Sequence, residues 1–471
     1  MINIFNKPAS FHNCLFDNIL CNGDVDYSSL ITFTSSLNNN YFNMNEVTIN
    51  KCMSNGDFII IQGSKSNIKF ENMNINNTIS YGSLINNLSF NSEIIISNAY
   101  VINNKNTNKL KCGLITNNGN TNLIIDNSKF ERNENKNNGG VICFMNIDDS
   151  RIKISSSSFI NNYALNGGVM YLYDRKLNDI KKNNDFILEI YDSSFIKNNA
   201  NYFGGVFNIE ANSLKILNMK NLNFTKNSAY AGGILYSNTI NFNNFQKDII
   251  SMNNIAESHG NEYASSPYMV NLNTTNSNEI SVKSGDKYPL TFVLKDKFNQ
   301  TVTDVSRYYS NMILTIYDDD DKNIENIKIT GNICSFSKGI CELKDFKIYS
   351  ETAMTIDFKF SIQNENKILF GNNKLKMIIN ECNEEQIKMY YNKYYYCEYP
   401  KCDLTTCPNE NANCEKGDLE NINTIKSNHC ICKGGWGGNN CSEKIYANIR
   451  YKFIYIKYIY IYIFYINSNY I

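Results

Sequence analysis

The chain has 471 residues, enough for several domains, and carries 45 Lys+Arg against 45 Asp+Glu. This formal net charge of zero argues against nucleic acid or an anionic membrane as the main partner, because both are bound through basic surfaces. The chain has only 5 Pro and many aromatic residues, which favours β structure. With only 3 His, clusters of His that bind metal or catalyse reactions are not expected, and no cofactor is predicted.

A repeat covers the first part of the chain and is clearest between residues 123 and 236. Each unit has a Phe, an Asn three residues later, and then a Gly pair followed by an aliphatic residue. The second Gly recurs about every 28 residues, with one insertion near 177–184 that we expect to protrude as a loop. Such a period is typical of a solenoid. The repeated residues are Phe130, Phe159, Phe195 and Phe224, with Gly140, Gly168, Gly205 and Gly233.

The repeat unit has the periodicity of a β-strand. Apolar residues stand seven and five positions before each Phe, as Ile152 and Ile154 do before Phe159, and polar residues alternate with them. One rung cannot bury its apolar face alone, so rungs must stack. We therefore predict a parallel β-helix over residues 1–275, with the Phe side chains inward, the glycines in one column, and Asn side chains hydrogen-bonded between rungs. A β-propeller is the alternative repeat architecture, but each of its blades would need about 40 residues, which is longer than this repeat.

Weaker copies of the repeat extend towards the N-terminus. The segments KCGLI, YGSLI, NGDFI and YSSLI place Gly113, Ser83, Asp57 and Ser29 in register with the second Gly. Roughly nine rungs at about 4.8 Å each give a rod on the order of 45 Å. Asn is abundant throughout, which AT-rich coding could explain, so position and not abundance supports these assignments.

The Phe-x-x-Asn and Gly-Gly motifs of residues 123–236 resemble the repeat of chlamydial polymorphic outer membrane proteins. The resemblance implies a right-handed β-helix with an adhesive or recognition role. The barrel through which those bacterial proteins are secreted has no counterpart in this chain, so that route of secretion is not implied.

Residues 276–380 have a different pattern of short strands, such as the alternation of Leu290, Phe292 and Leu294. About seven strands in a hundred residues predict an immunoglobulin-like β-sandwich. Cys334 and Cys341 flank a short hairpin-like loop and are expected to form a disulfide. The acidic run 318–321 is interpreted as a solvated turn and not a calcium loop, because no further acidic residues are spaced as ligands. Further strands are expected at 312–317, 326–330, 340–349, 354–362 and 374–380.

A cluster of six cysteines follows, and its last three have the spacing C-x-C-x8-C in CICKGGWGGNNC. Residues 402–444 resemble an EGF-like domain, with Gly435, Trp436 and Gly438 where that family has a glycine–aromatic–glycine turn. The EYPK segment before the first cysteine lacks the acidic residues of the calcium-binding subtype. A zinc site would need two C-x2-C motifs or further His ligands. The resemblance implies the disulfides Cys402–Cys414, Cys407–Cys430 and Cys432–Cys441.

The remaining cysteines and the C-terminal tail have less specific patterns. Cys382 and Cys397 flank a Tyr-rich segment within 381–401, which we interpret as a linker, and are expected to pair. The tail 445–471 is rich in Ile and Tyr, but charged residues interrupt it, so translation of AT-rich non-coding sequence is favoured over a membrane span. Five cysteines of the β-helix have no assigned partner: Cys14, Cys21, Cys52, Cys112 and Cys143.

Clustered cysteines favour an extracellular or cell-surface location. The start MINIFNKPASFHNC lacks the features of a signal peptide, so we expect sequence upstream or an incomplete gene model. The order of modules loosely resembles the ectodomains of fungal receptors with class C seven-helix membrane domains, and membrane attachment would come from sequence outside this chain. Glycosylation sequons give weaker support for secretion and occur at Asn76, Asn87, Asn223, Asn273, Asn299 and Asn440.

Two classes of function are consistent with a β-helix. Polysaccharide lyases and glycosidases need converging carboxylates. Here Asp126 and Asp192 take similar strand positions but belong to rungs separated by a third, whose equivalent residue is Ser; Asp148, Asp149 and Asp174 are scattered. We therefore predict a non-catalytic recognition region of a cell-surface receptor or adhesin that binds a glycan or a surface protein, with a polysaccharide-degrading enzyme as the alternative.

Overall fold

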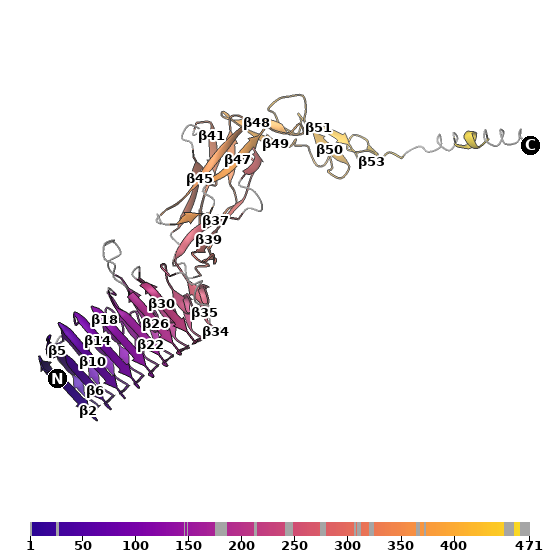
Figure 1. Cartoon of the computed structure of the whole chain (residues 1–471). Helices are drawn as coiled ribbons and strands as arrows, with labels where there is room; N and C mark the ends of the chain where they lie inside the picture. The colour runs from indigo at the N-terminus through magenta and orange to yellow at the C-terminus, as the bar shows by residue number, and fades with distance from the viewer. Residues whose placement is uncertain are drawn as a thin grey trace, which may run out of the picture.

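The structure is a computed structural model of the whole chain, in which a β-solenoid is followed by a second β domain and a small cysteine-rich module (Figure 1). The residues that it describes are 2–24, 28–145, 147, 149–174, 186–211, 214–240, 248–273, 279–305, 308, 312–319, 325–363, 368–371, 374–446 and 456–461. The insertion expected to protrude near 177–184 lies outside these ranges.

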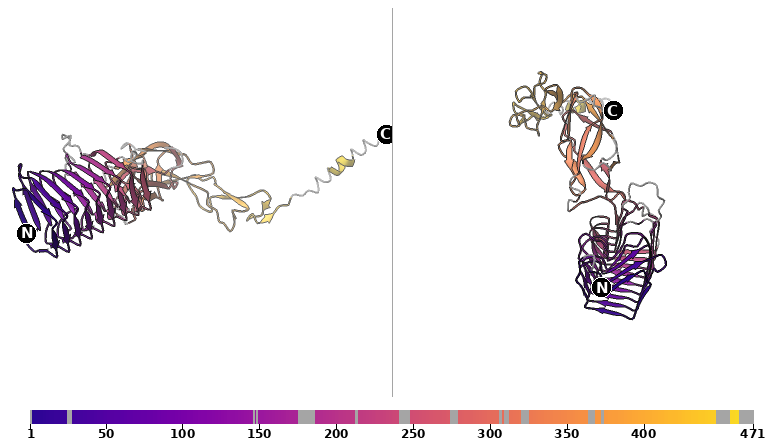
Figure 2. Two further views of the ribbon diagram at one scale, coloured as in Figure 1. Left: turned by 60° about the horizontal axis from the view of Figure 1, so that its bottom comes forward. Right: turned by 90° about the vertical axis from the view of Figure 1, so that its left-hand side faces the viewer.

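The solenoid is built from four parallel sheets, which we name A to D, and its strands stack into a rod (Figure 2). A complete rung contributes one strand to each sheet. Sheet B has eight strands and the other three sheets have nine or ten, so the described chain forms eight complete rungs, compared with the roughly nine expected. Sheet A comprises, in order, β1 (Ile2–Phe5), β5 (Ile31–Ser35), β9 (Ile59–Gly63), β13 (Ile85–Asn87), β17 (Ile115–Asn117), β21 (Ile142–Phe144), β25 (Met170–Tyr173), β29 (Phe207–Glu210), β33 (Leu235–Tyr236) and β36 (Tyr263–Ala264).

The other three faces of each rung follow in the same chain order. Sheet B comprises β2 (Ala9–His12), β6 (Tyr41–Asn45), β10 (Lys65–Glu71), β14 (Asn91–Ser97), β18 (Asn120–Asp126), β22 (Arg151–Ser155), β26 (Phe186–Tyr191) and β30 (Leu214–Lys220). Sheet C comprises β3 (Leu15–Asp17), β7 (Thr48–Asn50), β11 (Asn74–Asn76), β15 (Tyr100–Ile102), β19 (Lys129–Glu131), β23 (Ser158–Ile160), β27 (Ser194–Ile196), β31 (Leu222–Thr225) and β34 (Ile249–Met252). Sheet D comprises β4 (Leu20–Cys21), β8 (Met53–Ser54), β12 (Ile79–Ser80), β16 (Lys105–Asn106), β20 (Glu134–Asn135), β24 (Tyr163–Asn166), β28 (Asn199–Phe203), β32 (Ser228–Ala231) and β35 (Ile255–His259).

The repeated Phe residues form a column inside the rod, as predicted. Phe130, Phe159, Phe195 and Phe224 are partners in successive strands of sheet C, and all four are buried. Their rings stack with centroids 5.0 to 5.1 Å apart. Each ring therefore covers the next, and a rung gains its apolar burial only from its neighbours.

The two glycines of each pair have different roles. The first has a positive φ, for example +62° at Gly167, which residues with a Cβ rarely adopt. The second lies against the next rung: a Cβ at Gly168 would stand 2.2 Å from the carbonyl oxygen of Gly205. Gly113, placed by sequence with the second glycines, instead has a φ of +69°, so it takes the conformation of the first.

The Asn of the repeat forms a buried ladder between the rungs. In Asn162, Nδ2 donates to Asn198 Oδ1 and to the carbonyl oxygen of Phe130, both at 3.0 Å. Its Oδ1 accepts from the backbone N–H and Nδ2 of Asn133 at 3.1 and 3.0 Å. All four hydrogen-bonding positions of this side chain are used, which is why an amide can be fully buried here. The ladder runs through Asn104, Asn133, Asn162, Asn198, Asn227 and Asn254.

Other Asn residues occupy the corners of the solenoid. The residue before each ladder Asn has a positive φ, as at Asn103 (+56°) and Asn161 (+54°), and a second corner has the same conformation, as at Asn98 and Asn127. Asn tolerates this left-handed region better than most residues. Part of the Asn content therefore has a structural cause.

The second domain consists of three further sheets around one core. Phe292 from sheet E, Phe358 from sheet F and Phe346 beside sheet G are all buried in it. Sheet E comprises β43 (Ile340–Leu343), β39 (Leu290–Asp296), β37 (Pro267–Leu272) and β46 (Leu369–Phe370). Sheet F comprises β38 (Glu279–Lys283), β47 (Lys374–Asn380), β45 (Met354–Gln363), β40 (Ile313–Asp318) and β42 (Ile333–Ser335). Sheet G comprises β41 (Ile327–Thr330), β44 (Lys347–Ser350), β49 (Tyr394–Glu398) and β48 (Ile387–Tyr391).

Three expectations for this region need correction. Strand β37 already pairs with β39, so the sheets of the second domain begin before residue 276. The strand expected at 340–349 is two strands, β43 and β44, which belong to different sheets. The segment 381–401 is no linker: β48 and β49 form a hairpin that extends sheet G, and Tyr395 is fully buried. The disulfides Cys334–Cys341 and Cys382–Cys397 are present as expected.

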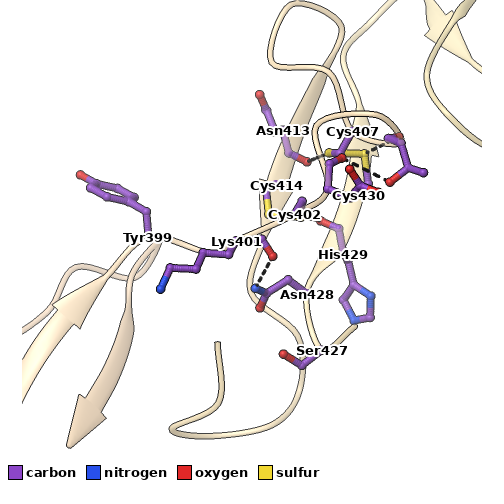
Figure 3. Close-up of a disulfide and its surroundings, with 12 residues drawn as sticks. Tyr399, Lys401, Cys402, Cys407, Asn413, Cys414, Ser427, Asn428, His429 and Cys430 are labelled. Carbon is purple, nitrogen blue, oxygen red and sulfur yellow. Dashed lines mark hydrogen bonds between the residues drawn. A yellow bond between two sulfur atoms is a disulfide. The ribbon is translucent and has the colours of Figure 1, made fainter. Parts of the chain in front are cut away.

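The cysteine-rich module has two small antiparallel sheets, held mainly by disulfides. Its bridges are Cys402–Cys414 and Cys407–Cys430, which Figure 3 shows, and Cys432–Cys441; these are the pairs that the EGF resemblance implies. The sheets are β50 (Ala412–Glu415) with β51 (His429–Cys432), and β52 (Trp436–Gly437) with β53 (Glu443–Lys444). The buried cluster consists only of Ala412 and cysteines, so covalent links replace a hydrophobic core.

The solenoid meets the second domain through a buried polar junction. The side chains of His259 and Asp296 are 1% and 0% exposed, with His259 Nε2 4.0 Å from Asp296 Oδ2. His259 Nε2 donates to the carbonyl oxygen of Ser265 (2.9 Å), and its Nδ1 contacts Ser258 Oγ (2.9 Å). Tyr230, in the solenoid, donates to Asp304 of the second domain at 2.5 Å. The second domain is thus attached to the last rungs by more than the chain itself.

Beyond the cysteine-rich module, residues 456–461 form a short, exposed helical segment. Among the residues that the structure describes, no helix is long and apolar enough to cross a membrane.

Candidate functional site

The outer face of sheet A is hollowed into a groove of about 800 Å³ between β9 and β25. Its floor consists of outward-facing residues of sheet A: Ile60 and Gln62 from β9, Asn86 from β13, Thr116 from β17 and Tyr171 from β25. One wall follows the carboxyl ends of the strands and includes Leu88, Asn118 and Met145. The opposite wall precedes the strands and includes Leu110, Lys111, Cys112, Asn137 and Asn138. Four strand spacings of about 4.8 Å make the groove about 19 Å long.

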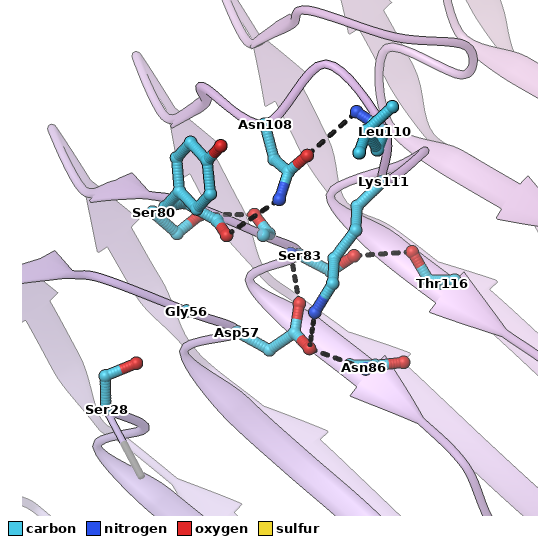
Figure 4. Close-up of polar contacts among 12 residues, drawn as sticks. Ser28, Gly56, Asp57, Ser80, Ser83, Asn86, Asn108, Leu110, Lys111 and Thr116 are labelled. Atoms are coloured by element: carbon cyan, nitrogen blue, oxygen red, sulfur yellow. Dashed lines mark hydrogen bonds and ion pairs between the residues drawn. The ribbon is translucent and has the colours of Figure 1, made fainter. Parts of the chain in front are cut away.

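A closed ion pair stands at one end of the groove (Figure 4). The carboxylate of Asp57 accepts hydrogen bonds from the Ser83 backbone N–H and Asn86 Nδ2, both at 2.7 Å, and from Lys111 Nζ at 2.8 Å. The Asp57 side chain is only 5% exposed. Because Lys111 reaches it from the wall, the carboxylate is neutralised where it is buried. This pair presents no net charge to a ligand.

The wall formed by residues 107–112 is fastened to the floor in two ways. Cys112 forms a disulfide with Cys143 of β21, which is fully buried beneath the wall. Asn106 Nδ2 also donates to the carbonyl oxygens of Lys111 (3.2 Å) and Gly113 (3.1 Å). The groove is therefore held open before any ligand arrives.

Two tyrosines from β25 form the other end of the groove. The rings of Tyr171 and Tyr173 lie 6.2 Å apart and nearly parallel, with an angle of 11° between them. Burial, and then the neighbouring Glu210, raise the pKa of Tyr171, so its hydroxyl stays protonated and can donate. Burial also raises the pKa of Glu210, which lies beside Tyr173 in β29. This end is aromatic and weakly acidic.

Two amide oxygens on this face of sheet A have no hydrogen-bond partner in the described part of the chain: Asn86 Oδ1 and Asn208 Oδ1. Asn86 is 8% exposed and Asn208 1%. Both side chains point outward, because they alternate with inward-facing residues: Ile85 and Asn87 in β13, and Phe207 and Ile209 in β29. Buried acceptors are nearly always satisfied in proteins, so these two atoms are exceptions within the described chain.

The carboxylates singled out in the sequence do not converge. In the strand register, Asp126 aligns with Ser155 and then with Tyr191, whereas Asp192 lies at the corner that follows. The expectation that Asp126 and Asp192 occupy similar positions is therefore wrong. Asp126 accepts a hydrogen bond from Ser155 Oγ at 2.6 Å, and Asp192 accepts one from Asn221 Nδ2 at 2.7 Å. Asp174 is buried at the end of β25, Asp149 lies in a turn, and Asp148 falls outside the described residues.

The groove itself lacks a pair of carboxylates with catalytic spacing. Asp57 precedes β9 and Glu210 ends β29, five strand spacings or about 24 Å away. Paired carboxyl groups in glycosidases lie roughly 5–10 Å apart. Asp57 is the only carboxylate among the described residues that line the groove, so the lining offers hydrogen bonds and aromatic surface but no pair of carboxyl groups.

The predicted sequons differ in accessibility. Asn273, Asn299 and Asn440 are exposed, and Asn76 and Asn223 are partly exposed. Asn87 is fully buried and donates to Ser92 Oγ (2.6 Å) and Asn117 Oδ1 (3.0 Å), so a glycan at Asn87 is incompatible with the fold.

The acidic run of the second domain is only partly described. Asp319 forms ion pairs with Lys359 and Lys374 and its side chain is only 14% exposed, whereas residues 320 and 321 of the run lie outside the described residues. Within the described ranges, no group of three His, Cys, Asp or Glu side chains is close enough to hold a metal ion.

Sequence reasoning missed the groove and the Cys112–Cys143 bridge. A signal for the bridge was present, because Cys112 directly precedes Gly113 and Cys143 lies three residues after Gly140, on the next rung. Cys14, Cys21 and Cys52 are free and lie together in the first two rungs. No protein-family model, curated protein or solved structure matches this chain.

Proposed function

We propose that this chain is a non-catalytic recognition region of an extracellular protein, acting as the ligand-binding part of a cell-surface receptor or adhesin. The observation that supports it most is the groove on sheet A, in which polar and aromatic side chains are fixed by sheet hydrogen bonds, an ion pair and a disulfide. Side chains that are already ordered lower the entropic cost of binding.

The disulfides support the location. Six bridges join residues of the solenoid, the second domain and the cysteine-rich module. Structural disulfides persist in oxidising compartments and are rare in the cytosol. The cysteine-rich module lies at the end of the chain opposite the solenoid, so it would serve as a stalk that holds the solenoid away from a surface (Figure 1).

The proposal is tested with the full-length, oxidised protein. Fluorescently labelled protein is added to cells and to immobilised extracellular polysaccharides, and released sugar is measured in parallel. We expect saturable binding that depends weakly on salt, because the groove contains no unpaired charged cluster for salt to screen. Release of oligosaccharides from any polysaccharide would reject the non-catalytic assignment, and absence of binding to every surface would reject the recognition role.

A further inference from the structure

The groove on sheet A has the shape of a site for an extended chain and not for a compact small molecule. It runs along the stack for about 19 Å and is open on its outer side. The strand register places Ile60, Asn86, Thr116, Cys143 and Tyr171 in one row along the floor, and Gln62 lies two residues after Ile60 in β9. A ligand that lies along the axis would therefore pass over residues from successive strands about 4.8 Å apart, of which several are polar.

The polar groups in the groove match a ligand rich in hydroxyl groups. Amide and hydroxyl side chains can both donate and accept, as sugar hydroxyls do. Gln62 lies on the floor with a partly exposed amide, which can exchange hydrogen bonds with a ligand hydroxyl. The Thr116 hydroxyl lies within hydrogen-bond distance of Ser83 Oγ (2.5 Å) and of the Cys112 carbonyl oxygen (2.6 Å), which fixes its position on the floor.

The charges in the groove favour a neutral ligand. Asp57 and Lys111 neutralise each other, and a ligand with a carboxylate or sulfate would have to break this pair to gain a partner. Glu210, next to the tyrosine end, has a raised pKa because it is partly desolvated, and it would repel an anion when ionised. Neither end therefore offers a free cation to an acidic polymer.

Apolar surfaces in the groove suit the flat faces of sugar rings. Tyr173 stands beside Tyr171 with parallel rings, and amphipathic rings of this kind combine an apolar face with a polar edge. Leu88 and Leu110 project from the two walls and are 45% and 89% exposed, which leaves apolar surface at the rim for contact with a ligand.

The backbone of sheet A argues against a peptide. Peptides that lie along a sheet usually bind by adding a strand to a free edge. Strands β9 to β25 are each paired on both sides within the sheet, so the groove has no free backbone edge to extend. A peptide here would leave most of its own backbone groups to be satisfied by side chains.

We propose that the groove between β9 and β25 binds a neutral oligosaccharide laid along the axis of the solenoid, with Gln62 as a hydrogen-bonding residue, Tyr173 as a stacking residue and the buried Asn86 as a residue that shapes the floor. This inference rests on the proposed recognition function and names the ligand class for it.

The test uses the full-length oxidised protein and four variants on an array of neutral glycans, acidic glycans and decapeptides. Tyr173→Ala and Gln62→Ala remove groove side chains without touching the Asp57 network. Tyr191→Ala is the matched control, because Tyr191 also projects outward from a strand but belongs to sheet B. Asn86→Ser replaces the floor amide with a shorter hydroxyl side chain and removes its hydrogen bond to Asp57. Circular dichroism and the melting temperature of each variant check the fold.

We expect at least one neutral glycan to bind, with affinity reduced tenfold or more in Tyr173→Ala, reduced in Gln62→Ala and Asn86→Ser, and unchanged in Tyr191→Ala. Preference for acidic glycans or peptides, or neutral-glycan binding that Tyr173→Ala and Gln62→Ala leave intact, overturns the inference. Failure to bind any neutral glycan also overturns it. If labelled protein still binds cells in those cases, the recognition function stands and only the ligand class is wrong.

Discussion

The buried Asn ladder makes a sharp prediction at Asn162. The substitution Asn162→Asp keeps the shape of the side chain but removes the Nδ2 donor, which serves both Asn198 Oδ1 and the carbonyl oxygen of Phe130. Each buried polar group that loses its partner costs about 1–3 kcal/mol, so the two losses together lower the free energy of unfolding by about 2–6 kcal/mol. Burial of a carboxylate adds to this cost and raises its pKa, so the loss should grow as the pH rises.

The assay compares Asn162→Asp with Asn161→Asp, the same chemical change one residue earlier. Asn161 is exposed at a corner with a φ of +54°, which Asp also tolerates, so we expect a change within about 0.5 kcal/mol. Urea denaturation followed by circular dichroism gives the free energy, and hydrogen exchange of 158–166 shows whether the loss is local. If both variants change the free energy of unfolding equally, the ladder does not stabilise the fold as argued.

Three further predictions concern the glycine column, the junction and the groove. Gly168→Ala should destabilise the solenoid strongly, because the new Cβ would stand 2.2 Å from the carbonyl oxygen of Gly205. Gly434→Ala should be neutral, because no atom lies within 4 Å of the Cβ there. Thermal denaturation compares the melting temperatures of the two variants. Burial lowers the pKa of His259, and this effect outweighs the opposite effect of the carboxylates of Asp296 and Asp304, which raise it. The stability of the junction should therefore be complete above the unfolded-state pKa of about 6.5 and should decrease as the pH falls below that value. His259→Gln should flatten that pH dependence in protease-sensitivity measurements, and an unchanged profile would contradict the assignment. Replacing both Cys112 and Cys143 by Ser should leave the β-sheets intact, which circular dichroism checks, but should increase the hydrogen exchange of residues 107–112. Unchanged exchange would show that the hydrogen bonds of Asn106 alone hold the wall in place.

The repeat made the interior of the solenoid predictable. Phe159 and Gly168 recur at a fixed period, and residues at equivalent positions of stacked rungs must be neighbours, so their columns follow from spacing alone. A shift of one residue in the spacing breaks this correspondence. The sequence pattern groups Asp192 with Asp126, whereas the strand register aligns Asp192 with the corner residue Asn127. The same kind of shift separates Gly113 from the second glycines, because its positive φ is that of the first glycine of a pair.

Features that depend on irregular segments were beyond the sequence pattern. The groove exists because residues 107–112 fold over the outer face of sheet A, and no period describes that fold. The hairpin of β48 and β49 has the composition of a linker, because its many Tyr residues do not alternate clearly with polar residues as strand residues usually do. In the structure it belongs to sheet G, and Tyr395 is buried there. In contrast, the disulfides of the cysteine-rich module are those implied by the resemblance of residues 402–444 to an EGF-like domain, a module in which covalent links take the place of a large core.

The Asn ladder also determines how such a rod can grow during evolution. An inner ladder Asn is satisfied by the two adjacent rungs, as Asn162 is by Asn133, Asn198 and the carbonyl oxygen of Phe130. A gene duplication that copies one whole rung therefore supplies a new Asn whose donors and acceptors already match both neighbours. The rod would lengthen by about 4.8 Å per copied rung without any compensating substitution. A duplication of part of a rung would instead leave buried amides unpaired, so selection should favour changes in length by whole units.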